Sequence, residues 1–258
     1  MKKILFNIFI FSIILNCRAY AKTYDLSHIA KCKLVSEYSE NTKVDQMDTI
    51  TFGSYPQSDA SGNTKEPIEW IVLDKQEDKA LLMAKYVLDF KCYNDEKKYI
   101  TWKDCTLRDW LNVTFYNTAF NSNEIGKINI TYVLNNNKEG VSADGMTYDH
   151  IFLLSLDEAE KYFSSTSMNF NARRAAKGTY YAKNIHYKGL GLSYVNDNTD
   201  DSDEWSVNDD FWLRSIDMRG RYRSSIIVSA AKVGDRGHLS GLTVDYDLGV
   251  RPAMWVSY

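Results

Sequence analysis

One acidic run is the best candidate for a metal-binding site in this sequence. Residues 197–204 read Asp-Asn-Thr-Asp-Asp-Ser-Asp-Glu, and Ca²⁺ takes about six to eight such oxygen ligands. An EF-hand that begins at Asp197 fails, because Ser202 stands where a glycine is needed and Asn208 where a bidentate glutamate is needed. A solvated loop is the favoured interpretation. The carboxylates that a calcium site would use are Asp197, Asp200, Asp201 and Asp203.

Nucleophilic catalysis has little support from the residue pattern. The four histidines are scattered, and the Gly-x-Ser-x-Gly turn that presents a serine nucleophile is absent. A Ser-His-Asp triad is defined by geometry and not by order, so an exported hydrolase with an unrecognised site stays open as an alternative. Zinc is not indicated either, because the four cysteines include no C-x-x-C pair. We expect neither a cofactor nor catalytic residues.

Binding chemistry is concentrated in a late segment, residues 218–247. Arg, Tyr, Gly and Asp alternate there, in Arg-Gly-Arg-Tyr-Arg at 219–223, Gly-Asp-Arg-Gly-His at 234–238 and Asp-Tyr-Asp at 245–247. Rigid aromatic anchors among adaptable polar residues are typical of binding loops, and an ordinary polar strand face is the alternative. The predicted ligand contacts are Arg221, Tyr222, Arg223, Arg236, Asp245 and Tyr246.

Two arginines, Arg214 and Arg251, lie inside apolar runs of the late region. Each could form an anion site or clamp a ligand. The five fixed donors of a guanidinium also suit it to a buried structural role, bonded to backbone carbonyls or to an acid such as Asp210 or Asp245. We favour the structural role for both arginines.

The first residues have the order of a secretory signal. A basic pair at positions 2 and 3 precedes an apolar stretch at 4–15, and Ala-Tyr-Ala at 19–21 has the small-x-small pattern that signal peptidase reads. The apolar stretch is shorter than the about 20 residues that span a bilayer. We therefore expect cleavage after Ala21 and a protein that is secreted or held in the cell envelope.

A second processing route competes with simple cleavage. Cys17 follows Ile-Leu-Asn, which loosely resembles the lipobox of envelope lipoproteins. Acylation of Cys17 would tether the protein to a membrane, whereas cleavage after Ala21 would release it.

Export also bears on the other cysteines, because exported domains can keep disulfides. Cys92 and Cys105 are separated by a turn-like polar stretch. Pairing them would close a short loop and stabilise the fold by about 3 kcal/mol on the chain-entropy model. Two buried free thiols are the alternative.

The charge balance argues against nucleic acid and anionic lipid as partners. The formal net charge is −3, and removing residues 1–21, which hold three basic and no acidic residues, leaves −6. A chain of that sign has no electrostatic footprint for polyanions. The expected partner is an extracellular protein or glycan, with the membrane involved only through a lipid anchor at Cys17.

Short strands and isolated helices would position these residues. Two apolar runs at 69–74 and 80–87, separated by five polar residues, predict a hairpin. Leu107, Trp110, Leu111 and Phe115 fall on one face of a helix. Further strands are predicted at 50–57, 151–154, 211–214, 226–233, 242–246 and 250–256, and a further short helix at 121–128.

Two helix starts carry capping-box signals. Ser155 and Glu158 have the spacing of a capping box, and Thr106 with Asp109 is a shorter version of the same pattern. Because helices and strands do not alternate as βαβ repeats, the sequence predicts an α+β domain with antiparallel sheets and a few isolated helices. The expected organisation is a signal peptide at 1–21, a loosely packed polar segment at 22–47 and one domain at 48–258.

Six phrases in this order carry a family resemblance. They are Ile-Thr-Phe-Gly-Ser-Tyr-Pro-Gln at 50–57, Glu-Trp-Ile-Val-Leu at 69–73, Thr-Trp-x-x-Cys-Thr-Leu-Arg-x-Trp-Leu-Asn at 101–112, Phe-Tyr-Asn-Thr-Ala-Phe at 115–120, Phe-Trp-Leu-Arg-Ser at 211–215 and Gly-Val-Arg-Pro-Ala-Met-Trp at 249–255. Together they resemble a bacterial family, domain of unknown function 6273. Trp-Leu-Arg-Ser and Gly-Val-Arg-Pro also look like the end of sulfatase-modifying-factor domains, which have a C-type-lectin-like fold.

The resemblance implies a C-type-lectin-like, exported or surface-associated domain and no transferable activity. It places Cys92 and Cys105 where the family often has a cysteine pair, which favours the disulfide. Formylglycine-generating oxidases use late cysteines, and nothing after Cys105 is a cysteine. Calcium lectins use a Trp-Asn-Asp segment, which is also missing. We therefore predict a non-enzymatic binding module, with an exported hydrolase or a structural envelope component as alternatives. The residues expected to be structural are Trp110, Trp212, Arg214, Arg251 and Trp255.

Overall fold

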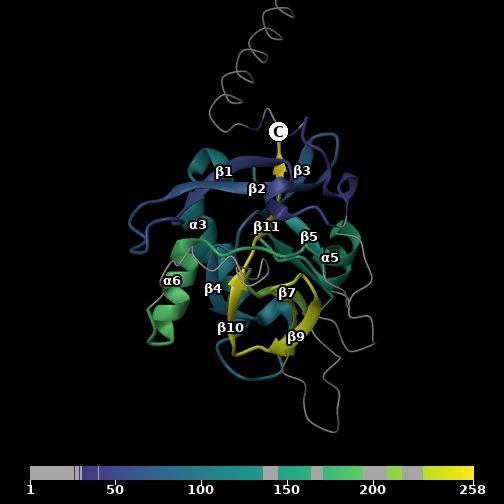
Figure 1. Cartoon of the computed structure of the whole chain (residues 1–258). Helices are drawn as coiled ribbons and strands as arrows, with labels where there is room; N and C mark the ends of the chain where they lie inside the picture. Colours follow the sequence, from purple (N-terminus) through teal and green to yellow (C-terminus); the bar gives the residue numbers. More distant parts are fainter. Residues whose placement is uncertain are drawn as a thin grey trace, which may run out of the picture.

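Strands of two larger sheets supply about half of the buried apolar residues that the structure describes. The computed structural model describes Leu26, Ile29 and residues 31–39, 41–135, 145–163, 171–193, 208–216 and 229–258. Within these ranges the strands form a four-stranded, a five-stranded and a two-stranded sheet. Figure 1 shows the four-stranded sheet at the end of the molecule marked C and the five-stranded sheet at the opposite end.

The four-stranded sheet has the order β1-β2-β3-β11, with β1 at Thr49–Tyr55, β2 at Glu66–Lys75, β3 at Lys79–Ala84 and β11 at Ala253–Ser257. All its neighbours are antiparallel. β2 and β3 are joined by a tight turn, so the predicted hairpin is confirmed. β3 is buried over 80–84 and β2 over 70–73, both apolar runs, which agrees with their place inside the sheet and not at its edge.

The five-stranded sheet has the order β4-β10-β7-β8-β9. Its strands are β4 (Asp89–Cys92), β10 (Asp247–Val250), β7 (Phe211–Ile216), β8 (Ser229–Val233) and β9 (Leu239–Thr243). β10 and β7 pair in parallel and the other neighbours are antiparallel. With a few helices around these sheets, the fold is α+β with mainly antiparallel pairing, as the sequence predicts.

The two-stranded sheet is a small antiparallel pair. It consists of β5 (Thr131–Leu134) and β6 (Met146–Asp149), which pair in antiparallel fashion. Val133, Thr147 and Asp149 face inward and are buried. The alternation of buried and exposed residues is the period of a strand that covers the core with one face only.

The chain crosses from the second sheet to the first at Arg251 and Pro252. The sequence predicts one strand over 250–256, but β10 ends at Val250 and β11 begins at Ala253. Pro252 has no N–H to give to a strand ladder, so an apolar run that contains it is broken there. The carbonyl of Pro252 instead accepts from the backbone N–H of Ala84 (2.8 Å).

A continuous helical segment contains α2 (Thr106–Asp109), a π-helical part, η5 (Trp110–Phe115), and α3 (Tyr116–Ala119). Leu111 and Phe115 are fully buried on the face that the sequence predicts. The predicted capping box at its start is wrong. Thr106 is already helical, and its hydroxyl accepts from the backbone N–H of Asp95 (3.1 Å).

Capping boxes do begin two later helices. In α5 (Leu156–Phe163) the Glu158 backbone donates to the Ser155 hydroxyl (3.1 Å), and the Ser155 backbone donates to the Glu158 carboxylate (2.9 Å), which confirms the prediction. In α4 (Ser122–Ile125) Asn121 and Glu124 form the same reciprocal pair. The remaining helical elements are η2 (Val35–Glu37), η3 (Val44–Gln46), η4 (Trp102–Asp104) and α6 (Tyr180–Gly189).

Two predicted strands differ from the structure, and one helix was not predicted. The run 151–154 is not a strand, because it makes only an isolated bridge between Phe152 and Ala253. The strand predicted at 242–246 ends early, at Thr243, and the chain turns there into β10. α6 was not expected from the sequence.

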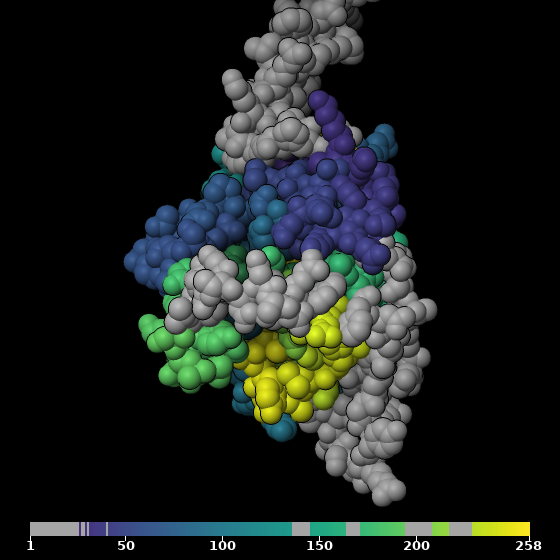
Figure 2. Space-filling model, viewed as in Figure 1, coloured from purple at the N-terminus to yellow at the C-terminus, as the bar shows by residue number. Residues whose placement is uncertain are grey.

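The polar segment at 22–47 packs more closely than the sequence predicts. Five of its described apolar residues are buried, and they join the main hydrophobic core. They are Leu26, Ile29, Val35, Val44 and Met47. In the space-filling view the purple atoms of this segment lie directly against the blue atoms of the strands that follow (Figure 2). Among the described ranges, no helix has the length and apolar character that a bilayer crossing requires.

The predicted Cys92–Cys105 disulfide is absent, and both thiols are free. The Cys92 thiol donates to the carbonyl of Asp245 (3.3 Å), in the turn before β10, whereas the Cys105 thiol donates to the carbonyl of Trp102 (3.3 Å) inside the core. The two thiols therefore bond to different carbonyl groups and not to each other. Burial raises the pKa of the Cys105 thiol to about 12, so it stays protonated at neutral pH.

Candidate functional site

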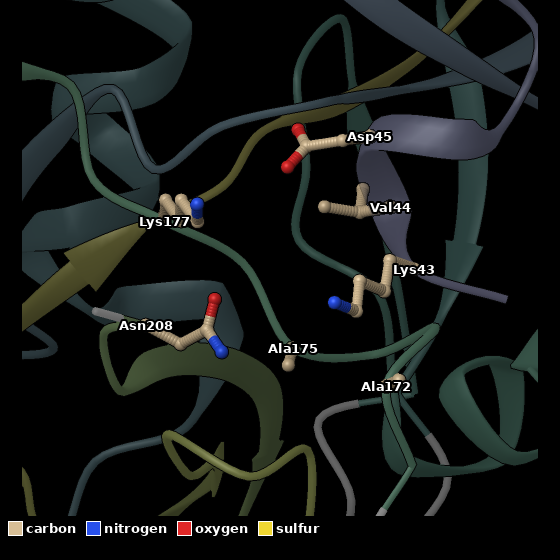
Figure 3. Close-up of a pocket in the computed structure, with 7 residues that line it drawn as sticks. All are labelled: Lys43, Val44, Asp45, Ala172, Ala175, Lys177 and Asn208. Atoms are coloured by element: carbon tan, nitrogen blue, oxygen red, sulfur yellow. The ribbon is translucent and has the colours of Figure 1, made fainter. Parts of the chain in front are cut away.

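A pocket of about 140 Å³ opens between three parts of the chain that are far apart in sequence. Lys43, Val44 and Asp45 come from the polar segment, a second group comes from residues 172–177, and Asn208 precedes β7. Figure 3 shows these side chains around one open space. The lining consists of Lys43, Val44, Asp45, Ala172, Ala175, Lys177 and Asn208.

Arg173 holds the polar segment against the domain. Its buried guanidinium donates to the carbonyls of Val35, Tyr38 (3.2 Å) and Tyr162 (3.2 Å). Farther along the segment, the Tyr86 hydroxyl donates to the Asp45 carboxylate (3.3 Å). Because both ends of 35–45 are bonded to the domain, the pocket wall they form has a fixed position.

The second wall, residues 172–177, is bonded to two different strand connections. The backbone N–H of Asn171 donates to the carbonyl of Arg236 (3.0 Å), in the turn between β8 and β9. Gly237 in that turn has φ 74° and lies so close to Asn171 that a Cβ would clash with its backbone, so only glycine fits. After β3, the backbone N–H of Val87 donates to the carbonyl of Lys177 (2.9 Å).

Asn208 is placed by its neighbour Asp209. The Asp209 carboxylate accepts from the backbone N–H of Gly178 (2.7 Å) and pairs with Lys183 (3.2 Å). Burial raises the pKa of Asp209 and the Lys183 ammonium opposes that rise. These contacts join the start of β7 to the residues around Lys177.

The pocket has a charged rim and an apolar floor. Figure 3 shows the ammonium groups of Lys43 and Lys177 and the carboxylate of Asp45 directed toward the same space. Val44, Ala172 and Ala175 supply apolar surface. The described lining residues thus carry two ammonium groups and one carboxylate.

A fully buried guanidinium lies behind this lining. Arg251 is 1% exposed, and it donates to the carbonyls of Ala84 (2.7 Å) and Arg174 (3.1 Å). Its guanidinium carbon lies 5.3 Å from the ring centre of Phe211, a cation–π distance. Burial lowers the pKa of Arg251 to about 9, and the carboxylate of Asp45 raises it. At neutral pH the group therefore carries its charge.

Among the described residues, the lining offers one carboxylate and two amines for acid–base chemistry, and its seven described members include no Ser, Thr, Cys or His. Elsewhere in the described ranges, His150, His186 and His238 bond to no serine, threonine or cysteine side chain; His186 instead pairs with Asp247 (2.9 Å). Those ranges also hold no group of three or more His, Cys, Asp or Glu that could bind a metal ion.

The predicted ligand contacts are only partly described. Arg221, Tyr222 and Arg223 lie outside the described residues, as do the carboxylates at 197, 200, 201 and 203. Arg236 is exposed in the turn before β9, whereas Asp245 and Tyr246 lie in the turn after it. The five residues of β9 separate these turns by about 16 Å. The structure therefore brings Arg236 near the pocket and leaves Asp245 and Tyr246 at the other end of the strand.

Arg214 lies in the core and holds α5 to β7. It donates two hydrogen bonds to the Glu158 carboxylate, one of them at 2.9 Å, and another to the carbonyl of Leu153 (2.8 Å). Its acidic partner is thus Glu158, not Asp210 or Asp245.

The tryptophans expected to be structural differ in burial. Trp212 is buried, and its indole N–H donates to the carbonyl of Lys91 (2.9 Å). Trp110 and Trp255 are half-buried and pack against the core. Each lies under a lysine ammonium, that of Lys91 and that of Lys79 respectively.

The pocket residues Lys43, Asp45, Lys177 and Asn208 were not among the predicted contacts. No motif joins them, since they come together only through long-range backbone bonds. A local signal exists for the wall behind them: Arg173 and Arg174 are adjacent charges flanked by alanines, a composition that suits buried guanidiniums more than an exposed basic patch.

Fold and pocket together define an α+β domain with a small charged pocket. The chain belongs to the family described as Domain of unknown function (DUF6273), which matches residues 77–258. No curated protein and no solved structure matches the chain. The match begins after β2, so the phrases at 50–57 and 69–73 precede it.

Proposed function

We propose that this chain is a non-enzymatic binding module that recognises a protein or glycan outside the cytoplasm. The observation that carries the proposal is the pocket, because its lining combines an apolar floor with a few convergent polar groups. That composition is typical of recognition sites. A hydrolase would need paired carboxylates or a nucleophile beside a base, and the described lining residues supply one carboxylate and no such pair.

The finer fold assignment belongs to this proposal. A C-type-lectin-like domain is supported by Trp-Leu-Arg-Ser at 212–215 and Gly-Val-Arg-Pro at 249–252, which lie in β7 and at the crossing between the two sheets. An experimental structure whose β7, β10 and β11 follow the lectin-like topology supports this assignment, and a different strand order contradicts it.

The binding proposal is tested by blocking the pocket. Immobilised protein is probed with a glycan array and with an extract of the cell envelope, and the bound material is quantified. Ala172→Leu, which places a larger side chain in the lining, is expected to reduce binding of the captured ligand by about tenfold or more. Ala60→Leu, a similar change in the loop before β2, is the matched control. Equal binding by both variants and the unchanged protein refutes the pocket as the binding site.

Export is tested separately, on protein isolated from its native host. Residues 1–21, which include Cys17, lie outside the described residues. The proposal of export therefore rests only on the order of basic, apolar and small-x-small regions in the sequence. Amino-terminal sequencing that starts at Lys22 supports secretion, and an acylated Cys17 supports a tethered lipoprotein. Met1 retained on the exported protein excludes both routes.

A further inference from the structure

The guanidinium of Arg251 is a buried charge with incomplete compensation. Two of its nitrogens donate to backbone carbonyls, while the third, Nη2, is buried without a hydrogen-bond partner. No carboxylate among the described residues forms an ion pair with Arg251. A buried charge normally has both a counter-charge and a full set of hydrogen bonds, because desolvation is costly otherwise.

Arg251 lies directly behind the pocket. Its Nη1 bonds to the carbonyl of Arg174, and the next residue, Ala175, is part of the lining. Figure 3 shows the yellow chain that leaves β10 passing behind the pocket, between the side chains of Lys177 and Asp45. Its charge therefore adds to that of the lysines in front of it.

Among the described residues, the rim has two ammonium groups and one carboxylate. Lys177 is exposed and forms no ion pair within the described residues. Asp45 supplies the carboxylate of the lining, and it is bonded to the Tyr86 hydroxyl and faces solvent. Lys43 and Asp45 belong to one wall of the pocket, Lys177 belongs to the 172–177 wall, and Arg251 bonds to the backbone of that second wall. Three cationic side chains and one carboxylate of the described residues would therefore act on an anion in the pocket.

We propose that the pocket binds a small oxyanion, a carboxylate or phosphate group at the end of a larger ligand. This inference rests on the proposed binding function and names its ligand class. A volume of about 140 Å³ is below the about 300–1,000 Å³ of pockets for drug-sized molecules, so it accommodates one end group and leaves the rest of the ligand outside. The alanine floor packs against the carbon skeleton of that group while the amines bond to its oxygens.

The oxyanion could be a carboxylate or a phosphate group, and four probes distinguish these two. Glucuronate offers a carboxylate on a sugar, glucose 6-phosphate offers a phosphate on a sugar, inorganic phosphate offers the anion alone, and glucose is the neutral control. Binding is followed by NMR of the methyl groups of Ala172 and Ala175, both in the lining. We expect at least one acidic probe to shift these signals, glucose to leave them unchanged, and added salt to weaken the shift.

Two variants with opposite expected effects make the test specific. Lys177→Gln should weaken the acidic probe by about tenfold, because one charge-assisted hydrogen bond is lost. Asp45→Asn should tighten it by about threefold, because a repelling charge is removed and the Tyr86 bond is kept. Lys103→Gln removes an exposed lysine from η4, outside the lining, and should change nothing. A merely structural role for Asp45 predicts no gain in affinity.

The outcomes separate this inference from the proposed function. If glucose binds as well as the acidic probes, or if Asp45→Asn does not tighten binding, the pocket is not an anion site although it remains a binding site. If none of the probes moves the alanine signals at millimolar concentration, the oxyanion inference is overturned. The binding function itself fails only if Ala172→Leu also leaves capture from glycans and extract unchanged.

Discussion

Replacing Asp149 by asparagine tests whether the family phrase at 101–112 is scaffold. Asp149 is 1% exposed, at the end of β6, and three donors converge on its carboxylate. They are the indole N–H of Trp102 (2.8 Å), the hydroxyl of Thr147 (2.8 Å) and Nε of Arg108 (2.6 Å). Trp102 and Arg108 belong to the family phrase, so this carboxylate fixes the phrase against the β5–β6 hairpin.

The expected cost follows from these contacts. Asparagine has the same shape, and its oxygen can keep the bonds from Trp102 and Thr147. Its NH₂ group then faces the Nε–H of Arg108, so the charge-assisted bond, worth about 1.5–3 kcal/mol, is lost and a donor is left unpaired at about 1–3 kcal/mol. The Arg108 side chain is 21% exposed, and water can reach part of it. We therefore expect Asp149→Asn to lower the free energy of unfolding by about 3 kcal/mol.

Urea denaturation measures this loss. With a slope of about 3 kcal/mol per molar urea, the midpoint should fall by about 1 M. Asp104→Asn, an exposed aspartate in η4, is the matched control and should stay within about 0.5 kcal/mol of the unchanged protein. A double-mutant cycle with Arg108→Met should give a coupling of at least about 1 kcal/mol. A loss below about 1 kcal/mol, or no coupling, would falsify the scaffold role assigned to this carboxylate.

Three further changes separate core, thiol and titration effects. Trp212→Ala should lower the free energy of unfolding by about 3–5 kcal/mol, because a buried indole and its hydrogen bond are removed. The control Tyr246→Ala, at a side chain that is 56% exposed, should change the free energy of unfolding by less than about 0.5 kcal/mol. Similar urea midpoints for the two variants would contradict the burial of Trp212. Iodoacetamide at pH 8 should leave Cys105 unmodified until the protein is denatured, because burial raises its pKa to about 12, and peptide mapping that recovers Cys92 linked to Cys105 would show the free thiols to be wrong. Burial lowers the pKa of His150 from its usual 6.5, so the unfolded chain binds the proton first as pH falls. The resulting destabilisation is absent well above pH 6.5, grows as pH falls from 6.5 to the folded pKa, and is constant below that. His150→Phe, which keeps the stacking on Tyr116, should remove that component, and an unchanged pH profile of the urea midpoint would refute it.

Local signals in the sequence were sufficient for several elements. Ser155 and Glu158 satisfy each other within one turn, so their spacing alone predicts the start of α5. The β2–β3 hairpin follows from two apolar runs and a short polar turn. α6 was missed because its residues form no clean apolar stripe, although Thr179, whose hydroxyl accepts from the Ala182 backbone, is a recognisable N-cap.

The pocket could not be predicted from the sequence because long-range bonds create it. Lys177 reaches its place through the bond between Val87 and its own carbonyl. Lys43 and Asp45 reach theirs through Arg173, whose donors end on carbonyls about 135 residues earlier. Neither set of hydrogen bonds produces a periodic pattern in the sequence. Because the acceptors are backbone carbonyls, which every residue has, the residue types at those positions do not indicate the bonds.

Scaffold and recognition are carried by different parts of this chain. The family match at 77–258 includes β3 but neither β1 nor β2. β3 is buried along almost its whole length, so without β2 it would be an exposed apolar edge, the arrangement that invites aggregation. The residues before the match are therefore part of the folding unit, and they also supply Lys43 and Asp45. The scaffold residues Trp212, Arg214 and Arg251 lie inside the match, whereas the rim charges that would choose a ligand lie on both sides of its boundary. Exchanging the segment at 35–45 should therefore change ligand preference while the two sheets and the buried arginine behind the pocket stay as they are.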